Sequence, residues 1–349
     1  MTNPCYRMPA EWELQKAVLL AWPHADTDWV AYLREIQDVV VRLVEVITGY
    51  EDVIILTPDD EDVRAHLSSV LSAKRMKRVQ IVTVPTDDTW VRDYGPITLV
   101  ADIAGHHPSS ADIKLLDFRF NAWGEKFAAD KDNVINGLLY AHGCLSGQYE
   151  AHLDFVLEGG SIESDGKGTL FTTSSCLLAP HRNQPLTRRQ LTLRLKTMLH
   201  AKRVVWLTHG QLMGDDTDGH IDTIVRCAPN DTLLYVSCND RKDKHFADFQ
   251  ALKRQLQRIK TPEGRPYRLL PLPMPEAMCY DCERLPATYA NYLVINDAVI
   301  CPTYGQPIND KIAMQVLSEA FPERNIIGVD ASVIIRQHGS IHCMTMQLY

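Results

Sequence analysis

Short apolar runs and helical apolar stripes alternate along nearly the whole chain, and this alternation limits the fold more than any other feature of the sequence. Residues 30–47 carry apolar side chains at helical spacing behind a cap at Thr27 or Asp28, and Gly49 ends this helix before an apolar strand at residues 53–56. The alternation predicts a mixed α/β fold. Further helices are expected at residues 60–71, 133–140, 187–200, 246–259 and 309–320, and further strands at residues 79–84, 113–118, 204–207, 233–236, 292–295 and 298–301.

No stretch of the sequence marks a boundary between domains. There is no Ser/Gly-rich or Pro-rich linker and no charge block, and the one proline cluster, residues 271–275, is expected to be a short extended connection. Thr187 and Asn309 are the expected caps of two helices, and Ile326 begins a last strand–helix–strand segment. We therefore predict a single domain over residues 1–349, built from repeated units.

The composition excludes several classes of function. With 36 Lys and Arg against 44 Asp and Glu, the net charge is −8, which disfavours nucleic acid and favours a cationic partner. No apolar run approaches the roughly 18 residues of a membrane span, and the first residues have no signal-peptide pattern. Nine irregularly spaced cysteines predict a reducing, cytoplasmic location. Cys279 and Cys282 lack the second pair that a zinc site needs, so we interpret them as incidental thiols.

The chain ends in an unusual run, residues 338–349, which we expect to be strand-like with a Gly-Ser turn before a central cysteine, Cys343. A cysteine is a nucleophile only as a thiolate, so it needs a nearby base or a positive field.

Residues 214–222 combine acids with a histidine. A calcium loop is excluded because its sixth position would be Ile221 and its twelfth Cys227. If this segment is a strand, His220 and Asp222 project to the same face, as a general base beside an anchoring carboxylate. The alternative is an acidic surface turn with a solvated histidine.

Residues 87–96 form a second dense polar stretch. Asp93, on the face opposite Arg92, is a candidate to receive a guanidinium, and Trp90 is a candidate wall of the same site. The alternative is a structural Arg–Asp pair at a turn, with a core tryptophan.

Two further segments place polar or aromatic groups beside glycines. Glu158 follows an apolar run and precedes two glycines, which permit close approach of the backbone. It is a candidate to orient His220. Trp123 is a candidate pocket wall within residues 120–124. The alternatives are a glutamate at a hairpin mouth and a turn with a packed tryptophan.

The candidate residues recur along the chain at separations of about 45–75 residues, a scale typical of repeated supersecondary units. Residues 160–163 read Gly-Ser-Ile-Glu and residues 339–342 read Gly-Ser-Ile-His. This echo predicts similar turns that present different side chains to one shared centre.

One thiol, one imidazole and three carboxylates together fit the chemistry of a guanidinium. Two carboxylates can hold its N–H donors, and a thiolate can then attack the fixed carbon. An imidazole can protonate departing ammonia and afterwards activate water. This chemistry requires no metal and no organic cofactor.

At these residues the sequence resembles the agmatine deiminase family, within the guanidine-modifying enzymes that include arginine deiminases and bacterial peptidylarginine deiminases. The resemblance extends almost from end to end. It lies at residues 8–12, 21–24, 88–96, 121–124, 158–163, 216–222, 290–292, 302–304 and 341–345.

The resemblance implies a five-bladed α/β propeller, the pentein fold, made of ββαβ-like units around a pseudo-fivefold axis with the site at the axis. Position by position, it implies that Cys343 is the nucleophile and His220 the acid/base. It further implies that Asp93 and Asp222 hold the guanidinium, and that Glu158 lies beside the histidine.

The resemblance also implies that agmatine is hydrolysed to N-carbamoylputrescine and ammonia. Trp90 and Trp123 match substrate-pocket positions, and we expect Asp215 or Asp216 to meet the second charge of agmatine. Free arginine would need a cation for its carboxylate, and Arg336 is the nearest in sequence. The partner expected is this small cation, not nucleic acid or a membrane; a homo-oligomer is compatible with the sequence.

The chain departs from the family at two places that bear on the far end of the substrate. Residues 337–343 read Gln-His-Gly-Ser-Ile-His-Cys where many relatives have Gly-Gly-Gly-Asn-Ile-His-Cys, and Gln15 stands where histidine is common. The rival interpretations are a peptidylarginine or free-arginine deiminase, an amidinotransferase, and a binding protein without turnover.

Overall fold

The strands form small sheets that repeat one pattern of pairing. The computed structural model describes residues 5–102 and 109–349 as a mixed α/β protein. Within this part of the chain, five sheets of three or four strands and one two-stranded hairpin are present. The strands are β1 (Tyr6–Arg7), β2 (Ala17–Ala21), β3 (Asp52–Thr57), β4 (Val79–Thr83), β5 (Ile97–Ala101), β6 (Ile113–Arg119), β7 (Gln148–Val156), β8 (Ile162–Ser164), β9 (Thr169–Thr173), β10 (Arg203–Leu207), β11 (Val225–Ala228), β12 (Thr232–Ser237), β13 (Arg268–Pro273), β14 (Cys279–Tyr280), β15 (Glu283–Arg284), β16 (Leu293–Ile295), β17 (Ala298–Thr303), β18 (Asn325–Asp330) and β19 (Met346–Leu348).

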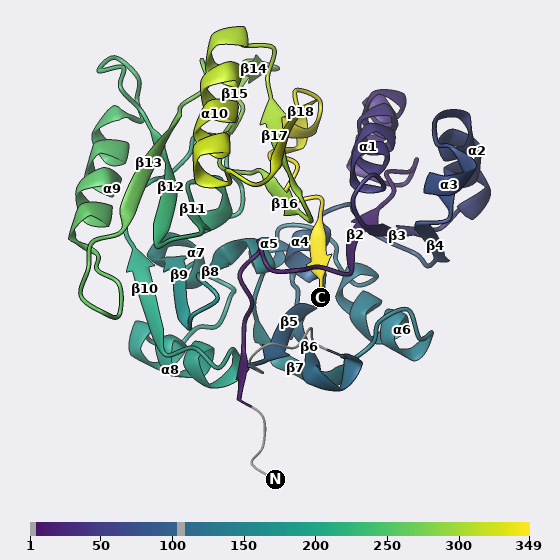
Figure 1. Ribbon diagram of the computed structural model, residues 1–349, viewed down its shortest axis with the longest axis horizontal. Coiled ribbons are helices and arrows are strands. Elements are labelled where there is room, and N and C mark those ends of the chain that lie inside the picture. Colours follow the sequence, from purple (N-terminus) through teal and green to yellow (C-terminus); the bar gives the residue numbers. More distant parts are fainter. Residues whose placement is uncertain (1–4, 103–108) are drawn as a thin grey trace.

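In each of the five larger sheets a strand pairs antiparallel with the next one, which then pairs parallel with a third. The pairs β5–β6, β8–β9, β11–β12 and β16–β17 are antiparallel, and β6–β7, β9–β10, β12–β13 and β17–β18 are parallel. In the fifth sheet, β2 is parallel to β3 but antiparallel to β19, which comes from the C-terminal end of the chain. The C-terminal run is therefore joined to the N-terminal segment, as the position of the C label beside β2 shows (Figure 1).

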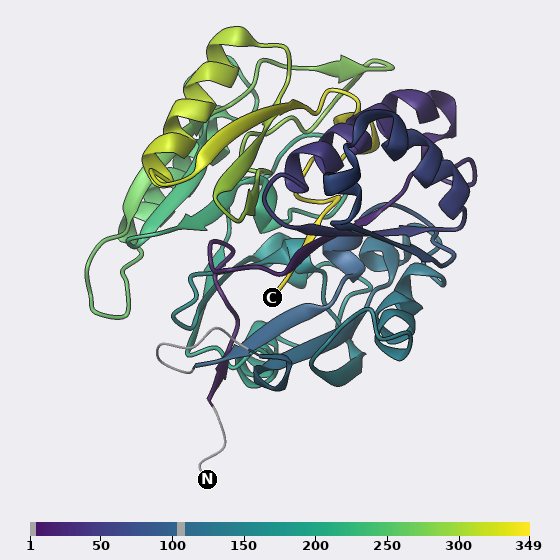
Figure 2. The same ribbon diagram turned by 45° about the vertical axis from the view of Figure 1, so that its right-hand side comes forward.

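The longer helices cover the outer faces of these sheets, whereas the short helices α4 (Val91–Tyr94) and α5 (Ala122–Glu125) lie between the sheets near the centre (Figures 1 and 2). α1 packs against β3 and β18, α8 against β10, α9 against β12, and α10 against β13, β17 and β18. Apolar side chains of these elements form the core. The helices are α1 (Leu33–Ile47), α2 (Asp60–Val70), α3 (Ala73–Met76), α4 (Val91–Tyr94), α5 (Ala122–Glu125), α6 (Ile135–Ala141), α7 (Ser174–Leu177), α8 (Arg188–Met198), α9 (Phe246–Arg258) and α10 (Pro307–Ala320).

Most of the expected elements are present close to their predicted bounds. Thr187 caps α8 in a capping box with Gln190, as predicted. The proline cluster is extended as expected, but residues 268–273 form the edge strand β13, where prolines are tolerated because one side of the strand is unpaired. The predicted cap at Asn309 is wrong, because α10 begins earlier at Pro307, a residue suited to a first turn.

Two local predictions near the candidate residues are also wrong. Only residues 346–348 of the C-terminal run are a strand, and Cys343 lies in the turn before them. Residues 221–223 form a short 3₁₀ helix, η5 (Ile221–Thr223), instead of a strand. Within residues 5–102 and 109–349, none of the helices has the length and hydropathy to cross a bilayer.

Candidate active site

Cys343 is held in its turn by one asparagine from the loop before β16. The Oδ1 atom of Asn291 accepts from the backbone N–H of Cys343 at 3.2 Å and from that of His342 at 2.9 Å, and it lies 3.3 Å from the Cys343 thiol. The backbone N–H of Arg92 donates to the Cys343 carbonyl at 3.2 Å. The thiol therefore has a fixed position at the point where the C-terminal turn meets α4 and the 291 loop.

The surroundings of Cys343 disfavour a thiolate while the site holds no cation. Burial raises the pKa of the Cys343 thiol well above its usual range, and the charges of Asp222 and Asp93 raise it further. Hydrogen bonds of the thiol with the Ser340 backbone and the Asn291 side chain oppose this shift without cancelling it. A bound cation near the two aspartates would favour the thiolate.

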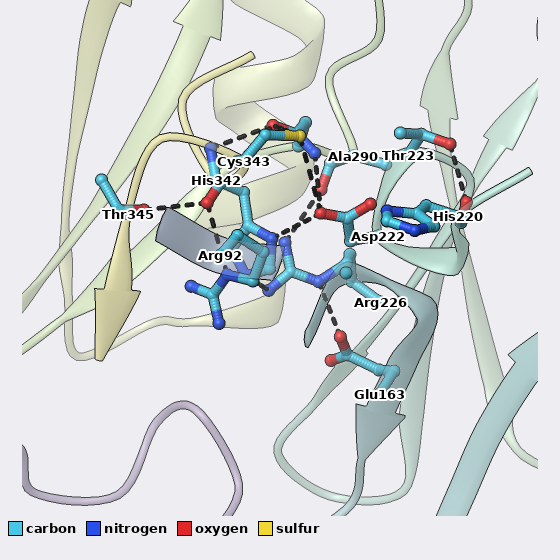
Figure 3. Close-up of polar contacts among 12 residues, drawn as sticks. Arg92, Glu163, His220, Asp222, Thr223, Arg226, Ala290, His342, Cys343 and Thr345 are labelled. Carbon is cyan, nitrogen blue, oxygen red and sulfur yellow. Dashed lines mark hydrogen bonds and ion pairs between the residues drawn. The ribbon is translucent and has the colours of Figure 1, made fainter. Parts of the chain in front are cut away.

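Asp222, on η5, points at the nucleophile (Figure 3). Its Oδ2 atom lies 3.8 Å from Cys343 Sγ, 2.8 Å from His342 Nδ1 and 3.1 Å from the amide nitrogen of Asn291. Its other oxygen, Oδ1, is buried without a hydrogen-bond partner. Burial alone would raise the pKa of Asp222, but the hydrogen bond and charge of His342 hold it below its ordinary value. One charged carboxylate oxygen is thus free to accept a hydrogen bond beside the thiol.

His220 lies between two carboxylates. Its Nδ1 atom is 3.6 Å from Asp93 Oδ1 and its Nε2 atom is 3.8 Å from Glu158 Oε2, and neither nitrogen forms a hydrogen bond. Burial lowers the pKa of His220, but the charge of Asp93 and the neighbouring Cys176 and Glu158 raise it well above its ordinary value. The backbone at Gly160 passes so close that a Cβ there would be 2.6 Å from His220 Nδ1. A protonated imidazole is therefore favoured, with each nitrogen facing a carboxylate.

Glu158 is oriented by a buried arginine that follows α7. Arg182 Nε donates to Glu158 Oε1 at 2.9 Å, and its other nitrogens donate to Asp218 at 2.5 Å and to the Thr217 carbonyl at 3.0 Å. Burial would raise the pKa of Glu158, but the adjacent His220 imidazole and the hydrogen bond and charge of Arg182 hold it below its ordinary value. Glu158 therefore stays charged behind the imidazole.

A cavity of about 200 Å³ opens onto Cys343 and Asp93. Its walls carry four aspartates and three aromatic rings, and no Lys or Arg of the described residues lines it. The lining residues are Asp28, Asp88, Trp90, Asp93, Trp123, Phe127, Asp216, Thr217, Gln337, His338, Gly339 and Cys343.

Aromatic side chains and strained backbone shape the cavity walls. Trp123 Nε1 donates to Asp93 Oδ2 at 2.9 Å, and its backbone has a φ of +55°, a conformation that few non-glycine residues adopt away from functional sites. Trp90 packs on Trp29 with 5.6 Å between ring centroids, and a Cβ at Gly339 would be 2.2 Å from the Trp90 ring. Both tryptophans predicted as pocket residues line the cavity, and a glycine is required opposite Trp90.

The two acids expected at the far end of the substrate differ in position. Asp216 lines the cavity, and burial, with Asp215 nearby, raises its pKa to about 6 although His338 opposes this. Asp215 does not line it, because its oxygens accept from the backbone N–H groups of Thr217 at 3.1 Å and Gly219 at 2.6 Å. Asp215 therefore shapes the loop that carries Asp216.

The five residues expected to carry chemistry lie together, although they come from separate elements. The predicted same-face arrangement of His220 and Asp222 is present, through a 3₁₀ turn instead of strand alternation. The alternative of an Arg92–Asp93 pair is wrong, because Arg92 Nε donates to the His342 carbonyl at 3.3 Å (Figure 3), away from the cavity. Arg336 also lies outside the cavity lining and pairs with Glu35 at 2.8 Å.

Sequence reasoning gave no role to three side chains of the site. Asn291 lay within a recognised motif without a role, and Arg182 and Cys176 had no local signal at all. Asp88 and Asp28 also line the cavity, but Asp88 had no role within the polar stretch at residues 87–96 and Asp28 was expected only as a possible helix cap.

The sequence echo has a structural counterpart. Arg226 Nε donates to Glu163 Oε2 at 2.9 Å, and its terminal nitrogen lies 3.1 Å from His342 Nε2 (Figure 3). The last residues of the two echoed segments thus meet at one buried arginine, which also forms an ion pair with Glu11. This shared centre lies behind Asp222, since His342 contacts both.

A buried thiol beside carboxylates, an imidazole and an acidic cavity is typical of enzymes that attack a cationic carbon through cysteine. The family model of the Porphyromonas-type peptidyl-arginine deiminases matches residues 7–348, so the chain belongs to this family. The family membership expected from the sequence is confirmed.

Individual relatives match over nearly the full length. The agmatine deiminase of Stutzerimonas stutzeri is 32% identical, over 98% of this chain and 95% of its own. A Porphyromonas gingivalis structure, described provisionally as an arginine deiminase, is 44% identical with a TM-score of 0.90 over 98% of both chains. A cysteine-to-serine variant of the C. jejuni agmatine deiminase, solved with substrate bound, is 36% identical with a TM-score of 0.89, over 100% of this chain and 98% of its own.

Proposed function

We propose that this protein is an agmatine deiminase, a C–N hydrolase that converts agmatine and water into N-carbamoylputrescine and ammonia. The observation that carries the proposal is the cavity: four aspartates and three aromatic rings surround the Cys343 thiol, and no Lys or Arg of the described chain lines the walls. Such a cavity fits a ligand that is cationic at both ends. Relatives named agmatine deiminases support the same substrate.

The reaction begins when the guanidinium of agmatine enters between Asp93 and Asp222. The unpartnered Oδ1 of Asp222 and the Asp93 carboxylate accept its N–H groups, which fixes the central carbon near Cys343 Sγ. The cation also offsets the two negative charges that raise the pKa of the thiol, so the thiolate forms as substrate binds.

The thiolate then bonds to the guanidinium carbon and makes a tetrahedral intermediate. His220 gives a proton to one terminal nitrogen, the C–N bond breaks and ammonia leaves, with an amidino-thioether remaining on Cys343. Water, deprotonated by His220, attacks the same carbon. The C–S bond breaks and releases the carbamoyl product, and the thiolate is restored. Glu158, held by Arg182, keeps His220 oriented and stabilises its charged form.

The far end of agmatine is an ammonium, and we assign it to Asp88 and Asp216 in the outer part of the cavity. Burial raises the pKa of each carboxyl to about 6, so each is poised to gain a cationic partner. Free arginine would place a carboxylate near the same aspartates, and Arg336 lies outside the cavity lining. The geometry therefore favours agmatine over arginine.

We extend the proposal to the architecture and the location. The shared antiparallel–parallel pattern of the five larger sheets supports five blades of a pentein propeller that form a single domain. All nine cysteines lie in the described residues as free thiols, which supports a cytoplasmic location.

The test is ammonia release from agmatine, arginine and a peptidyl-arginine by the wild-type protein, with Cys343→Ala and Cys279→Ser as matched variants. We expect turnover of agmatine, loss of turnover in Cys343→Ala, and retention in Cys279→Ser, whose thiol is exposed on the β14–β15 hairpin. Preference for arginine or the peptide would overturn the substrate. No turnover by folded wild-type protein would overturn the enzyme.

A further inference from the structure

A second thiol lies on the side of His220 that faces away from Asp93. Cys176, on α7, has its Sγ atom 3.8 Å from Glu158 Oε2, and the same oxygen lies 3.8 Å from His220 Nε2. Ligand atoms of the three side chains all lie within 4.8 Å of one another, and all three residues are buried. The mechanism above uses Glu158 and His220 but gives Cys176 no role.

This triad matches the donor set of a zinc site with an open fourth position and approaches its spacing. Zinc is bound by thiolate, imidazole and carboxylate at roughly 2.0–2.3 Å, so tetrahedral ligands lie roughly 3.3–3.8 Å apart. The two separations from Glu158 Oε2 are 3.8 Å each and the three ligand atoms lie within 4.8 Å of one another, so the side chains must move closer by a few tenths of an ångström or more to bind one ion. Among the described residues His220 Nε2 has no hydrogen-bond partner, so the ion would replace only its 3.8 Å contact with the Glu158 carboxylate.

The residues around the triad already orient its ligands. Arg182 binds only the Oε1 atom of Glu158 and leaves Oε2 facing the other two residues, as hydrogen bonds do for carboxylates that ligate metals. The positive charge of Arg182 is balanced by Asp218, at 2.5 Å. The hydroxyl of Thr173 accepts from the Cys176 N–H at 3.3 Å and donates to the Gly219 carbonyl at 2.6 Å, which ties α7 to the residue before His220.

We propose that Glu158, Cys176 and His220 form an inhibitory site for a thiophilic divalent cation, with Zn²⁺ as the fitting ion. Zinc bonds to Cys176 Sγ, His220 Nε2 and Glu158 Oε2, and the thiol proton and any proton on Nε2 pass to solvent. The bound ion occupies the imidazole that transfers protons, so deimination stops until a chelator removes the ion. Affinity rises with pH, because the ligands must lose protons. Zinc binding itself does not rest on the proposed function; only the inhibition does.

Cobalt(II) is the spectroscopic probe of this site, because a cobalt–thiolate bond gives an intense near-ultraviolet absorption. Wild-type protein, Cys176→Ser, Cys176→Ala and Cys343→Ser are freed of metal and titrated with Co²⁺, and Zn²⁺ affinity is measured by competition with a chelating indicator. We expect one ion per chain and a thiolate absorption in wild type and in Cys343→Ser. Both Cys176 variants should lose the absorption and bind Zn²⁺ at least about tenfold more weakly.

The Cys343→Ser variant distinguishes binding of the ion at this site from binding of the ion by the nucleophile. Absorption that persists in both Cys176 variants and disappears in Cys343→Ser would place the ion on the nucleophile and overturn the proposal. Absence of stoichiometric binding to folded wild-type protein would overturn it as well. Inhibition of agmatine turnover by Zn²⁺, reversed by chelator and weakened at least about tenfold in the active Cys176 variants, completes the test.

Discussion

Three carboxylates that line the cavity and three that lie behind the nucleophile are buried, yet the pKa values of the two groups move in opposite directions. Burial raises the pKa of Asp88 and Asp216 to about 6 and also raises that of Asp93. We call these three the cavity carboxylates. Neither Lys nor Arg among the described residues lines the cavity beside them. The neighbouring groups therefore compensate their desolvation only in part in the free protein.

The rear carboxylates, Glu11, Glu158 and Asp222, have the opposite behaviour. Burial would raise the pKa of each, but Arg226 and His342 beside Glu11, His220 and Arg182 beside Glu158, and His342 beside Asp222 hold it below the ordinary value. The cations beside the rear carboxylates outweigh the effect of burial, whereas His220 beside Asp93 and His338 and Lys126 near Asp216 offset it only in part. The cation that completes this compensation is the one that the substrate brings.

Among the variants that test this comparison, Asp93→Ala should have the largest effect on activity. We expect kcat/KM for agmatine to fall about 10⁴-fold, or about 5 kcal/mol, because both charge stabilisation and orientation of the guanidinium are lost. The free energy of unfolding should change by no more than about 1 kcal/mol, since the lost hydrogen bonds from Trp123 and Gly160 and the lost pairing with His220 are offset by removal of a buried charge whose desolvation is only partly compensated. Steady-state kinetics and urea unfolding measure the two quantities. A large loss of stability would mean that Asp93 behaves like the rear carboxylates.

The stabilising role of the cations beside the rear carboxylates is tested by Arg226→Met. Arg226 ion-pairs with Glu11 and Glu163 and donates to two backbone carbonyls. Its removal therefore takes the ion-pair partner from buried Glu163 and leaves Glu11 with His342 and Arg92. We expect the free energy of unfolding at pH 7 to fall by about 4 kcal/mol. The matched control is Arg268→Met, which breaks the half-exposed pair with Glu319 and should cost less than about 1 kcal/mol. Equal losses of stability in the two variants would mean that burial does not increase the contribution of an ion pair to the stability of this protein.

The same contrast explains which parts of the site could be predicted from the sequence. Asp93, His220 and Asp222 stand in dense polar motifs at breaks between apolar elements, and Cys343 stands in a glycine-containing turn, so local pattern was enough to select them. Their partners carry no such signal. Asn291 contacts Cys343 although the two residues are 52 positions apart in the sequence. This contact depends on how two sheets are placed relative to each other.

The local backbone was harder to predict than the side chains. The 3₁₀ turn at residues 221–223 and the turn at Cys343 depend on tertiary hydrogen bonds, such as those of Asn291, that override strand-like patterns. Asp215 and Asp216 are chemically identical neighbours, and only the loop conformation decides that one binds backbone N–H groups while the other lines the cavity. The regular elements were found because apolar periodicity is a local property.

The outer cavity carboxylates are tested by Asp88→Asn and Asp216→Asn. Each variant should raise KM for agmatine about tenfold, because one charged contact to the distal ammonium is lost, while kcat changes by less than about threefold. Asp26→Asn is the matched control, since this aspartate is exposed nearby but does not line the cavity. A fall in kcat with unchanged KM would move these residues from substrate binding to the chemical step.

The smallest effect is the pH dependence of binding, measured by calorimetry with agmatine and Cys343→Ser, which cannot turn over. Asp88 and Asp216 have pKa values of about 6 in the free protein, and a bound ammonium favours their charged forms. Each carboxyl is then largely charged at pH 7 but about half protonated at pH 6, so binding at pH 6 must release protons. Affinity should therefore fall about threefold between pH 7 and pH 6.

The contribution of these two groups to the stability of the free protein has the opposite pH dependence. Their folded-state pKa values lie above those of an unfolded chain, so protonation through about pH 6 relieves an incompletely compensated charge and contributes stability as the pH falls. The double variant Asp88→Asn/Asp216→Asn should have weaker affinity that no longer changes between pH 7 and pH 6. Persistence of the threefold change in that variant would place the titrating group elsewhere, with Asp93 as the remaining cavity carboxylate.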